Sequence, residues 1–282
     1  MISTEVLDVL QCPTCLSGSL SLGAGRRPEL ICEACEVHYP IIDGIPDLVV
    51  QQPVPQQASY RTETLTNAIA GIFDYVAPVL SMAIWRCSPL LYVDLENRAL
   101  GRANGGIFLE APIGTGVTLS PVIAPYHDVC IIGVDKSWKM LHQAAKRFRN
   151  VDARVQLIRA DYERLPLKSA AVQSLQSING LHVFTDRLAT LKEFRRCIAD
   201  GGHLSGSALV RAQEEVADVF LERYERYGIY PMLRSPEFLI QEMAAVPFED
   251  IHFSTHGAVM FFTSQAPDSQ AAESPEPKAA NA

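Results

Sequence analysis

The chain has 282 residues, which is enough for one large domain or two unequal ones, and its 48% hydrophobic content is sufficient for a buried core. The formal net charge is −8, and the first 50 residues carry seven acidic side chains against two arginines. An acidic N-terminal part repels phosphate backbones, so the charge argues against a protein dedicated to binding nucleic acid.

Four of the seven cysteines stand in the first 35 residues as two CxxC pairs with 16 residues between them, Cys12, Cys15, Cys32 and Cys35. This spacing is typical of a zinc ribbon, in which the four thiolates complete a tetrahedral Zn²⁺ site. The alternatives are disulfides, which no secretion signal accompanies, and His38 in place of one cysteine. We expect residues 1–50 to form a ribbon whose structural zinc supplies the stability that so short a segment lacks.

The next part of the chain is expected to form a linker between two domains and then a helical lid. The segment QQPVPQQ predicts a linker over residues 51–60, and residues 61–104 are expected to form a helical lid. The longest apolar stretch, 69–85, contains Asp74 and Pro78, which makes a membrane span improbable. The N-terminus lacks the basic start of a secretory signal, so we expect a cytoplasmic protein without a membrane span.

Apolar, β-branched runs then alternate with segments of helical spacing. Strands are predicted at 106–110, 129–135, 154–160, 172–178 and 202–209, and helices at 137–148 and 186–199. This alternation predicts an α/β fold over residues 105–264, a doubly wound, Rossmann-like, mostly parallel sheet with helices on both faces. A helix capped by Ser235 and an antiparallel C-terminal hairpin are expected to follow, and residues 265–282 are expected to be a disordered tail.

The segment EAPIGTG, from Glu110 to Gly116, follows the first predicted strand of this sheet. Its two glycines permit close approach of the backbone to a ligand, and Asp135 ends the next strand 19 residues after Gly116, where an acid binds ribose hydroxyls. Pro112 removes one amide donor, which disfavours a dinucleotide but not a phosphate-free, cationic nucleoside. The alternative is that the glycines only form a turn and Asp135 only caps the next helix.

Four segments in order, EAPIGTG, IIGVDKSWKML, LIRADYERLPL and SLQSINGLHVF, resemble the motif series of class I S-adenosylmethionine-dependent methyltransferases. The resemblance covers residues 105–210 and is greatest to the branch of quinone-biosynthesis and related small-molecule enzymes, whose helical lid resembles residues 73–86. The first 50 residues separately resemble the zinc ribbons that accompany or activate methyltransferases. S-adenosyl-L-methionine is therefore the implied cofactor.

The resemblance implies a role for each matching residue. Glu110 would help to hold the methionine amino group, Asp135 the ribose hydroxyls and Asp161 the adenine amino group. The full implied cofactor set is Glu110, Ala111, Gly114, Gly116, Asp135, Lys136, Met140, Asp161, Tyr162 and Asn179.

Two further predictions concern the acceptor side. His182 is a candidate general base, with a packing or pocket-lining histidine as the equal alternative. Tyr75 and Trp85 are candidates for an acceptor pocket, with a core or surface role as the alternative.

We expect a biosynthetic methyltransferase that acts on a small molecule. One alternative is an rRNA base methyltransferase, because one group of guanine-modifying enzymes joins a zinc ribbon to this fold, although the acidic charge disfavours RNA. The other is a protein that binds the cofactor without transferring its methyl group, or that converts the cofactor itself.

Overall fold

The structure is a computed structural model that describes residues 2–50, 73–151, 153–231 and 233–268. The predicted linker, 51–60, the first part of the predicted lid, 61–72, and most of the predicted tail, 269–282, lie outside the described residues. Within the described part of the chain, no helix is long and apolar enough to cross a membrane.

The N-terminal segment forms a small antiparallel sheet with one helix. The helix α1 (Thr4–Val9) begins after Ser3, whose hydroxyl accepts a hydrogen bond from the amide of Val6. The four strands pair in chain order and are β1 (Leu20–Leu22), β2 (Glu29–Cys32), β3 (His38–Ile42) and β4 (Ile45–Pro46). Strands this short bury little apolar surface, so the segment depends on other sources of stability.

A seven-stranded sheet forms the rest of the molecule, in the order β10-β11-β9-β8-β5-β6-β7. Its strands are β5 (Ile107–Glu110), β6 (Cys130–Asp135), β7 (Arg154–Arg159), β8 (Val172–Ser177), β9 (Ile198–Leu209), β10 (Glu249–His256) and β11 (Val259–Gln265). The pairs among β5 to β9 are parallel, whereas β11 pairs antiparallel with β9 and β10 pairs antiparallel with β11. The predicted fold class, including the antiparallel C-terminal hairpin, is confirmed.

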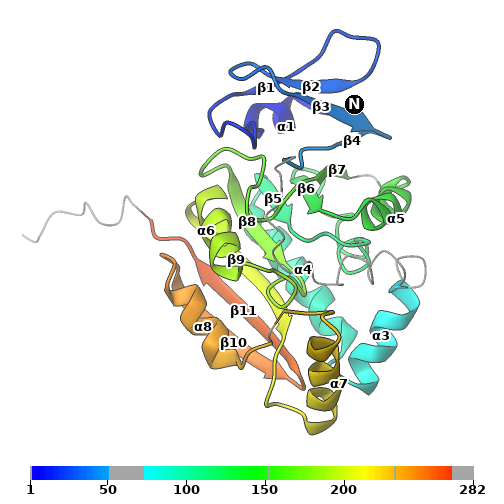
Figure 1. Ribbon diagram of the computed structural model, residues 1–282, viewed down its shortest axis with the longest axis vertical. Coiled ribbons are helices and arrows are strands. Elements are labelled where there is room, and N and C mark those ends of the chain that lie inside the picture. The colour runs from blue at the N-terminus through cyan, green and yellow to red at the C-terminus, as the bar shows by residue number, and fades with distance from the viewer. Residues whose placement is uncertain (1, 51–72, 152, 232, 269–282) are drawn as a thin grey trace, which may run out of the picture.

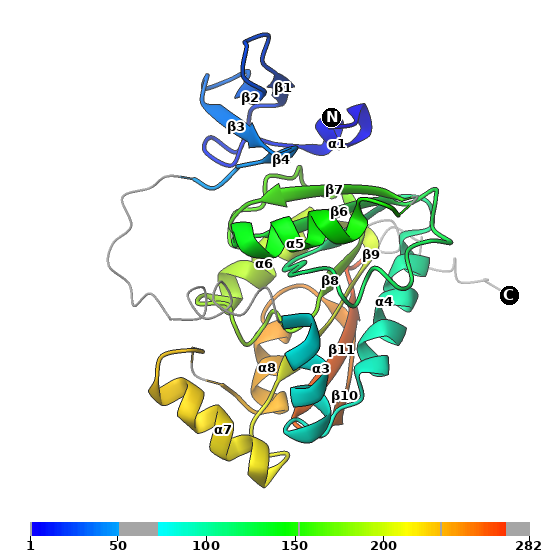
Figure 2. The ribbon, with the colours of Figure 1, turned by 90° about the vertical axis from the view of Figure 1, so that its right-hand side faces the viewer.

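Helices cover both faces of this sheet. They are α3 (Phe73–Ala83), α4 (Pro89–Ala103), α5 (Trp138–Phe148), α6 (Arg187–Cys197), α7 (Glu215–Arg226) and α8 (Pro236–Ala244). Because successive side chains of a strand point to opposite faces, Phe108 packs with α4 and α5, whereas Leu109 belongs to the core that α6 and α8 share. Figure 2 shows α5 in front of β6 and β7.

The small sheet lies beside β7, at one end of the large sheet (Figure 1). After β4 the chain pairs with this edge strand, since Asp47 bridges to Arg159 in parallel fashion and the amide of Leu48 donates to the Arg159 carbonyl at 2.8 Å. Leu10 and Leu48 are fully buried in the same core cluster as Leu109. The N-terminal segment therefore covers an edge strand that would otherwise expose unpaired backbone groups.

Arg159 links this segment to the strand end that carries Asp135. Its guanidinium donates to both carboxylate oxygens of Asp47, at 3.0 and 3.1 Å, and to the backbone carbonyl of Lys136, at 2.8 Å. It also lies 5.3 Å from the centre of the Trp138 ring, at the start of α5. Arg159 thereby connects the N-terminal segment to the residues that follow Asp135.

Candidate cofactor site and metal site

The loop after β5 is anchored to its two neighbouring strands. The amide of Ala111 donates to the Gln176 carbonyl of β8 at 3.0 Å, and the amide of Ile113 donates to the Val134 carbonyl of β6 at 2.9 Å. Pro112 stands between them after a cis peptide bond. The loop thus keeps its shape through the amides on either side of the proline.

The two glycines of the loop have different surroundings, which predicts different effects of substitution. Both have positive φ, +55° at Gly114 and +68° at Gly116, and a Cβ at Gly116 would lie 2.4 Å from Phe148 Cζ, whereas a Cβ at Gly114 would meet nothing within 4 Å. We expect Gly116→Ala to cost about 2–4 kcal/mol of unfolding free energy, from backbone strain and overpacking together. Gly114→Ala should cost only about 1–2 kcal/mol.

The open space above Gly114 is where the cofactor is expected. Gly114→Ala should therefore weaken binding of S-adenosylhomocysteine more than it lowers the melting temperature, and Gly116→Ala should do the reverse. Calorimetric unfolding and titration of both variants test this. Equal losses of stability would contradict the packing described for Gly116.

A contact with α3 holds the loop from outside. The hydroxyl of Thr115 donates to Asp74 Oδ1 at 2.5 Å, and Arg147 of α5 pairs with the other oxygen of Asp74. Arg147 Nε also donates to the Thr115 carbonyl at 2.9 Å. Sequence patterns did not indicate this triangle, because its members lie on three separate elements.

Asp135 joins the loop to the start of α5. Its Oδ2 accepts from the Gly114 amide at 2.9 Å and its Oδ1 from the Ser137 amide at 2.8 Å. The side chain is buried, and burial raises its pKa to about 6 although these amides and the Tyr162 hydroxyl favour the ionised form. Each carboxylate oxygen has a second lone pair, so both can still accept from a ligand.

Glu110 lies at the end of β5, and Glu96 of α4 is packed against it. The exposed fractions are 1% and 0%, and the two carboxyl groups lie close enough for each to shift the pKa of the other. Thr118 donates to Glu96 Oε1 at 2.8 Å, while Oε2 of each glutamate has no partner among the described residues. The sequence motifs did not point to Glu96, since it lies on α4, the helix that precedes the first strand of the large sheet.

Burial raises the pKa of both glutamates, that of Glu96 to about 7 and that of Glu110 well above its usual value. The further causes acting on Glu110 are the negative charges of Glu96 and Asp135. Three buried carboxyl groups therefore meet at the carboxyl ends of β5 and β6, and no cation among the described residues offsets them. This arrangement fits a positively charged ligand such as S-adenosylmethionine, which carries a sulfonium and an ammonium group.

The residues expected to border the adenine also lie together. Lys136 Nζ pairs with Asp161 at 2.9 Å and with Glu163 at 3.2 Å, and it lies 5.3 Å from the centre of the Tyr162 ring. Burial alone would lower the pKa of Lys136, but the two acids outweigh it and hold the pKa above its usual value. Met140 is buried in the first turn of α5, where its amide donates to Ser137 Oγ at 3.2 Å.

Asn179 follows β8 in a left-handed conformation, with φ of +51°. Its amide donates to Ser207 Oγ at 3.0 Å, and that hydroxyl donates to Asn179 Oδ1 at 3.3 Å. Tyr92 of α4 hydrogen-bonds to the Asn179 side chain. The residue is thereby oriented by β9 and α4, which sequence spacing did not indicate.

His182 is buried and neutral. Its Nδ1 accepts a hydrogen bond from the Leu209 amide at 3.1 Å, so Nε2 carries the proton. Burial lowers its pKa to about 3, with a smaller contribution from Arg187, and the Tyr230 ring packs edge-on at 5.0 Å. This geometry favours the packing alternative over a general base, because Nδ1 is occupied and the imidazole resists protonation.

Tyr75 and Trp85 are not brought together. Tyr75 is 78% exposed on α3, whereas Trp85 is buried against Tyr224, with ring centroids 6.4 Å apart. Trp85 shares a hydrophobic cluster with α4 and α7 and contributes to packing there.

The cysteine thiols form a compact cluster in the small N-terminal sheet. The Sγ atoms of Cys12, Cys15, Cys32 and Cys35 lie within 4.8 Å of one another, with Cys12–Cys35 at 3.7 Å and Cys15–Cys32 at 3.6 Å. A tetrahedral zinc site with Zn–S bonds of about 2.3 Å requires sulfur–sulfur distances of about 3.8 Å. The amides of Ala34 and Cys35 point to Cys32 Sγ at 3.4 Å, as a thiolate requires. His38 instead pairs with Glu29, at 3.1 Å.

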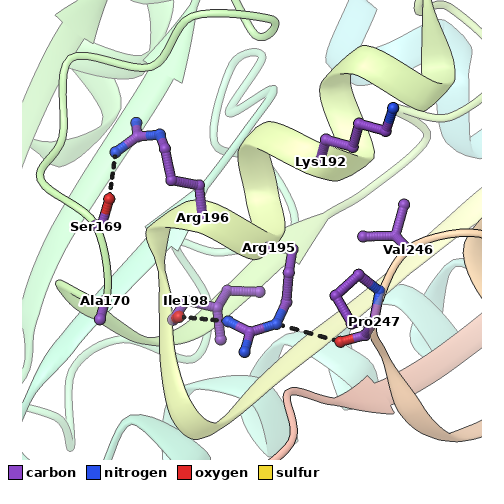
Figure 3. Close-up of a pocket in the computed structure, with 8 residues that line it drawn as sticks. All are labelled: Ser169, Ala170, Lys192, Arg195, Arg196, Ile198, Val246 and Pro247. Carbon is purple, nitrogen blue, oxygen red and sulfur yellow. Dashed lines mark hydrogen bonds between the residues drawn. The ribbon is translucent and has the colours of Figure 1, made fainter.

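A cavity of about 420 Å³ lies beside the C-terminal end of α6 (Figure 3). It is lined by residues before β8, at the end of α6 and before β10, which mark the amino ends of the strands. Its arginines are bound to the protein, since Arg195 donates to the carbonyls of Pro247 and Ile198, at 3.2 and 3.1 Å. The cavity is therefore separate from the carboxyl-end site.

Comparisons with known proteins match the two parts of the chain to different relatives. Residues 108–202 match a family described as a methyltransferase domain. The ubiquinone/menaquinone biosynthesis C-methyltransferase UbiE of Syntrophotalea carbinolica is 30% identical over 146 residues, which cover 51% of this chain and 59% of that protein. A UPF0434 protein of Nitrosococcus oceani is 42% identical over 48 residues, 17% of this chain and 78% of that protein.

Among solved structures, the fold is similar to phosphoethanolamine N-methyltransferase 2 of Haemonchus contortus, in complex with phosphomonomethylethanolamine and S-adenosylhomocysteine. The TM-score is 0.60 at 16% identity, over 77% of this chain and 62% of that one. At this identity the likeness concerns the fold alone.

Proposed function

We propose that this chain, which carries a class I S-adenosylmethionine-dependent methyltransferase domain and a four-cysteine zinc site, transfers a methyl group to a small-molecule acceptor. The observation that carries the proposal is the group of three buried carboxyls, Glu96, Glu110 and Asp135, which meet without a cation beside the glycine loop. In the proposed organisation, residues 1–50 are the ribbon and residues 105–264 the transferase domain. The biosynthetic role is inferred from the quinone-biosynthesis relative.

S-adenosylmethionine, when bound, would supply an electrophilic methyl group on a sulfonium. We assign the ribose hydroxyls to Asp135 and the ammonium group to Glu110, since carboxylates accept from diols and amines. Lys136, Asp161 and Tyr162 would border the adenine. Ala111, Gly114, Gly116, Met140 and Asn179 would line the same cofactor.

The acceptor is inferred to be apolar. Exposed apolar side chains cluster on α3 and on α7, which border the carboxyl ends of the strands, and they are Tyr75, Val79, Met82, Val216, Val219 and Phe220. Figure 1 shows both helices at the end of the molecule opposite the ribbon. Apolar surface of this kind suits a hydrophobic small molecule better than RNA, whose backbone calls for cations.

Because His182 is held neutral, the reaction is inferred to proceed without a histidine base. Holding the acceptor and the sulfonium in line, away from water, provides much of the acceleration in a displacement at carbon. An acceptor whose nucleophilic atom is already electron-rich can react in this way without a base to remove a proton.

Label transfer tests the function. The full-length protein is incubated with methyl-labelled S-adenosylmethionine and offered both a small-molecule extract and total RNA, which are separated afterwards. We expect label in the small-molecule fraction. Label in RNA would favour the rRNA alternative, and cofactor binding without any labelled product would favour the protein that does not transfer methyl. Asp94→Asn, on an exposed face of α4, serves as the control that keeps the activity.

A further inference from the structure

The pair of Glu96 and Glu110 needs an explanation of its own. Both side chains are at most 1% exposed, they come from different elements, and each presents one oxygen without a partner among the described residues. Thr118 supplies a neutral donor, to Glu96 Oε1. A buried carboxyl pair without a counter-ion is costly, so a fold that retains one implies a use for it.

The groups that face the pair have one sign of charge. Glu96 comes from α4 and Glu110 from β5, and the charged group that faces them from β6 is Asp135. The two oxygens of Asp135 already accept hydrogen bonds from the amides of Gly114 and Ser137. Two ionised carboxylates in contact repel strongly at low dielectric, whereas one proton between them relieves the repulsion.

We propose that Glu96 is a second ligand-binding carboxylate of the cofactor site, and that the ammonium group of the cofactor replaces a proton which Glu96 and Glu110 share in the ligand-free protein. The inference rests on the proposed function, because it states how the same cofactor is held. On binding, the O–H bond of the pair breaks, the proton leaves to solvent, and the ammonium N–H groups donate to the two carboxylates. No electron is transferred.

Affinity then depends on pH in a defined direction. Burial raises the pKa of both carboxyl groups, so the pair retains a proton at a pH at which exposed glutamates are ionised. Because binding releases this proton, affinity for a ligand with an ammonium group rises with pH, by up to about tenfold per unit, until the empty pair has ionised or the ligand's own ammonium group loses its proton.

Titration calorimetry with S-adenosylhomocysteine at pH 7 tests the proposal. The titration is repeated in phosphate and in Tris, which differ in ionisation enthalpy, and the slope of the observed binding enthalpy against that quantity counts the protons released. We expect a release of about one proton. A matched ligand, 5′-methylthioadenosine, keeps the nucleoside and the sulfur but lacks the amino acid part, so it should bind with no proton release.

Glu96→Gln and Asp94→Asn form the matched pair of variants. Both replace one acid of α4 by its amide, but Asp94 is exposed and paired with Arg98. In Glu96→Gln the proton release should fall, because one of the two carboxyl groups is gone, and S-adenosylhomocysteine should bind about tenfold more weakly, with 5′-methylthioadenosine unaffected. Asp94→Asn should behave like the unmodified protein in all three respects.

The outcomes separate this inference from the function on which it rests. If the unmodified protein binds S-adenosylhomocysteine with no proton release, or if Glu96→Gln changes neither affinity nor release, Glu96 is not part of the ammonium site although the cofactor assignment stands. If neither S-adenosylhomocysteine nor 5′-methylthioadenosine binds, the proposed function fails and this inference fails with it. The buffer series on the unmodified protein decides the matter even if Glu96→Gln does not fold.

Discussion

Replacing Cys32 by serine is expected to remove the zinc and to lower the melting temperature of the chain by roughly 6–12 °C. The Cys32 thiol is fully buried in the four-cysteine cluster, and three ligands hold zinc far less tightly than four. A structural zinc contributes about 10–16 kcal/mol of apparent binding free energy in isolated fingers. If zinc contributes only about 3 kcal/mol to the unfolding free energy of the whole chain, its loss lowers the melting temperature by the amount given above.

The measurements are the zinc content by native mass spectrometry and the melting temperature by calorimetry. Cys87→Ser is the control, because Cys87 is buried but lies outside the cluster, and this variant should retain one zinc per chain. A Cys32→Ser protein that still holds zinc, or that loses zinc without any loss of stability, would refute the structural role.

Zinc loss should also reach the cofactor site. The segment after β4 holds Arg159 through Asp47, and Arg159 holds the carbonyl of Lys136. We therefore expect a chelator-treated protein to bind S-adenosylhomocysteine more weakly than the zinc-loaded one at a temperature where both are folded.

Asp135→Ala is expected to weaken binding of S-adenosylmethionine roughly 10- to 150-fold, or about 1.5–3 kcal/mol, through two lost charge-assisted hydrogen bonds to the ribose. The substitution also leaves the amides of Gly114 and Ser137 without their acceptor. A loss of about 1–3 kcal/mol of stability should accompany it. Titration calorimetry and thermal unfolding measure the two effects separately.

Asp135→Asn distinguishes the ribose contact from the structural one, because the amide side chain keeps one oxygen for the loop. The pH dependence of stability gives a second readout. The buried Asp135 has a pKa of about 6, above the unfolded value of about 3.9, so its ionisation destabilises the ligand-free fold as the pH rises from about 4 to 6. Asp135→Asn should make that decline smaller. Unchanged affinity in both variants would contradict the ribose role.

The sheet could be predicted almost strand by strand, because a buried parallel strand leaves a run of apolar residues and each crossover helix leaves a 3.6-residue pattern. The segments predicted at 129–135 and 154–160 became β6 and β7 within one residue at either end. The zinc cluster could be predicted equally well, since each CxxC pair forms a tight turn that brings its two thiols to one metal site. These signals are short-range, so they survive in a linear sequence.

The candidate site could be predicted from the sequence only in part. Glycines and acids at strand ends, such as Gly114 and Asp135, follow from the topology of the sheet, but Glu96 and Asp74 lie on helices that precede the sheet and carry no motif. The state of His182 was also undetermined. Its tautomer depends on the Leu209 amide, 27 residues away, and its pKa depends on burial.

The sequence by itself therefore determined the fold class and the four-cysteine cluster, and it located the loop that we propose to bind the cofactor, because each depends on periodicity or on spacing within one or two elements. Only the tertiary structure decided that Glu96 joins Glu110 in a buried carboxyl pair, that Arg159 connects the zinc segment to Asp135, and that His182 is neutral. These properties depend on distances between elements far apart in the chain and on the exclusion of water around them. Pairing and desolvation arise only when the chain has folded.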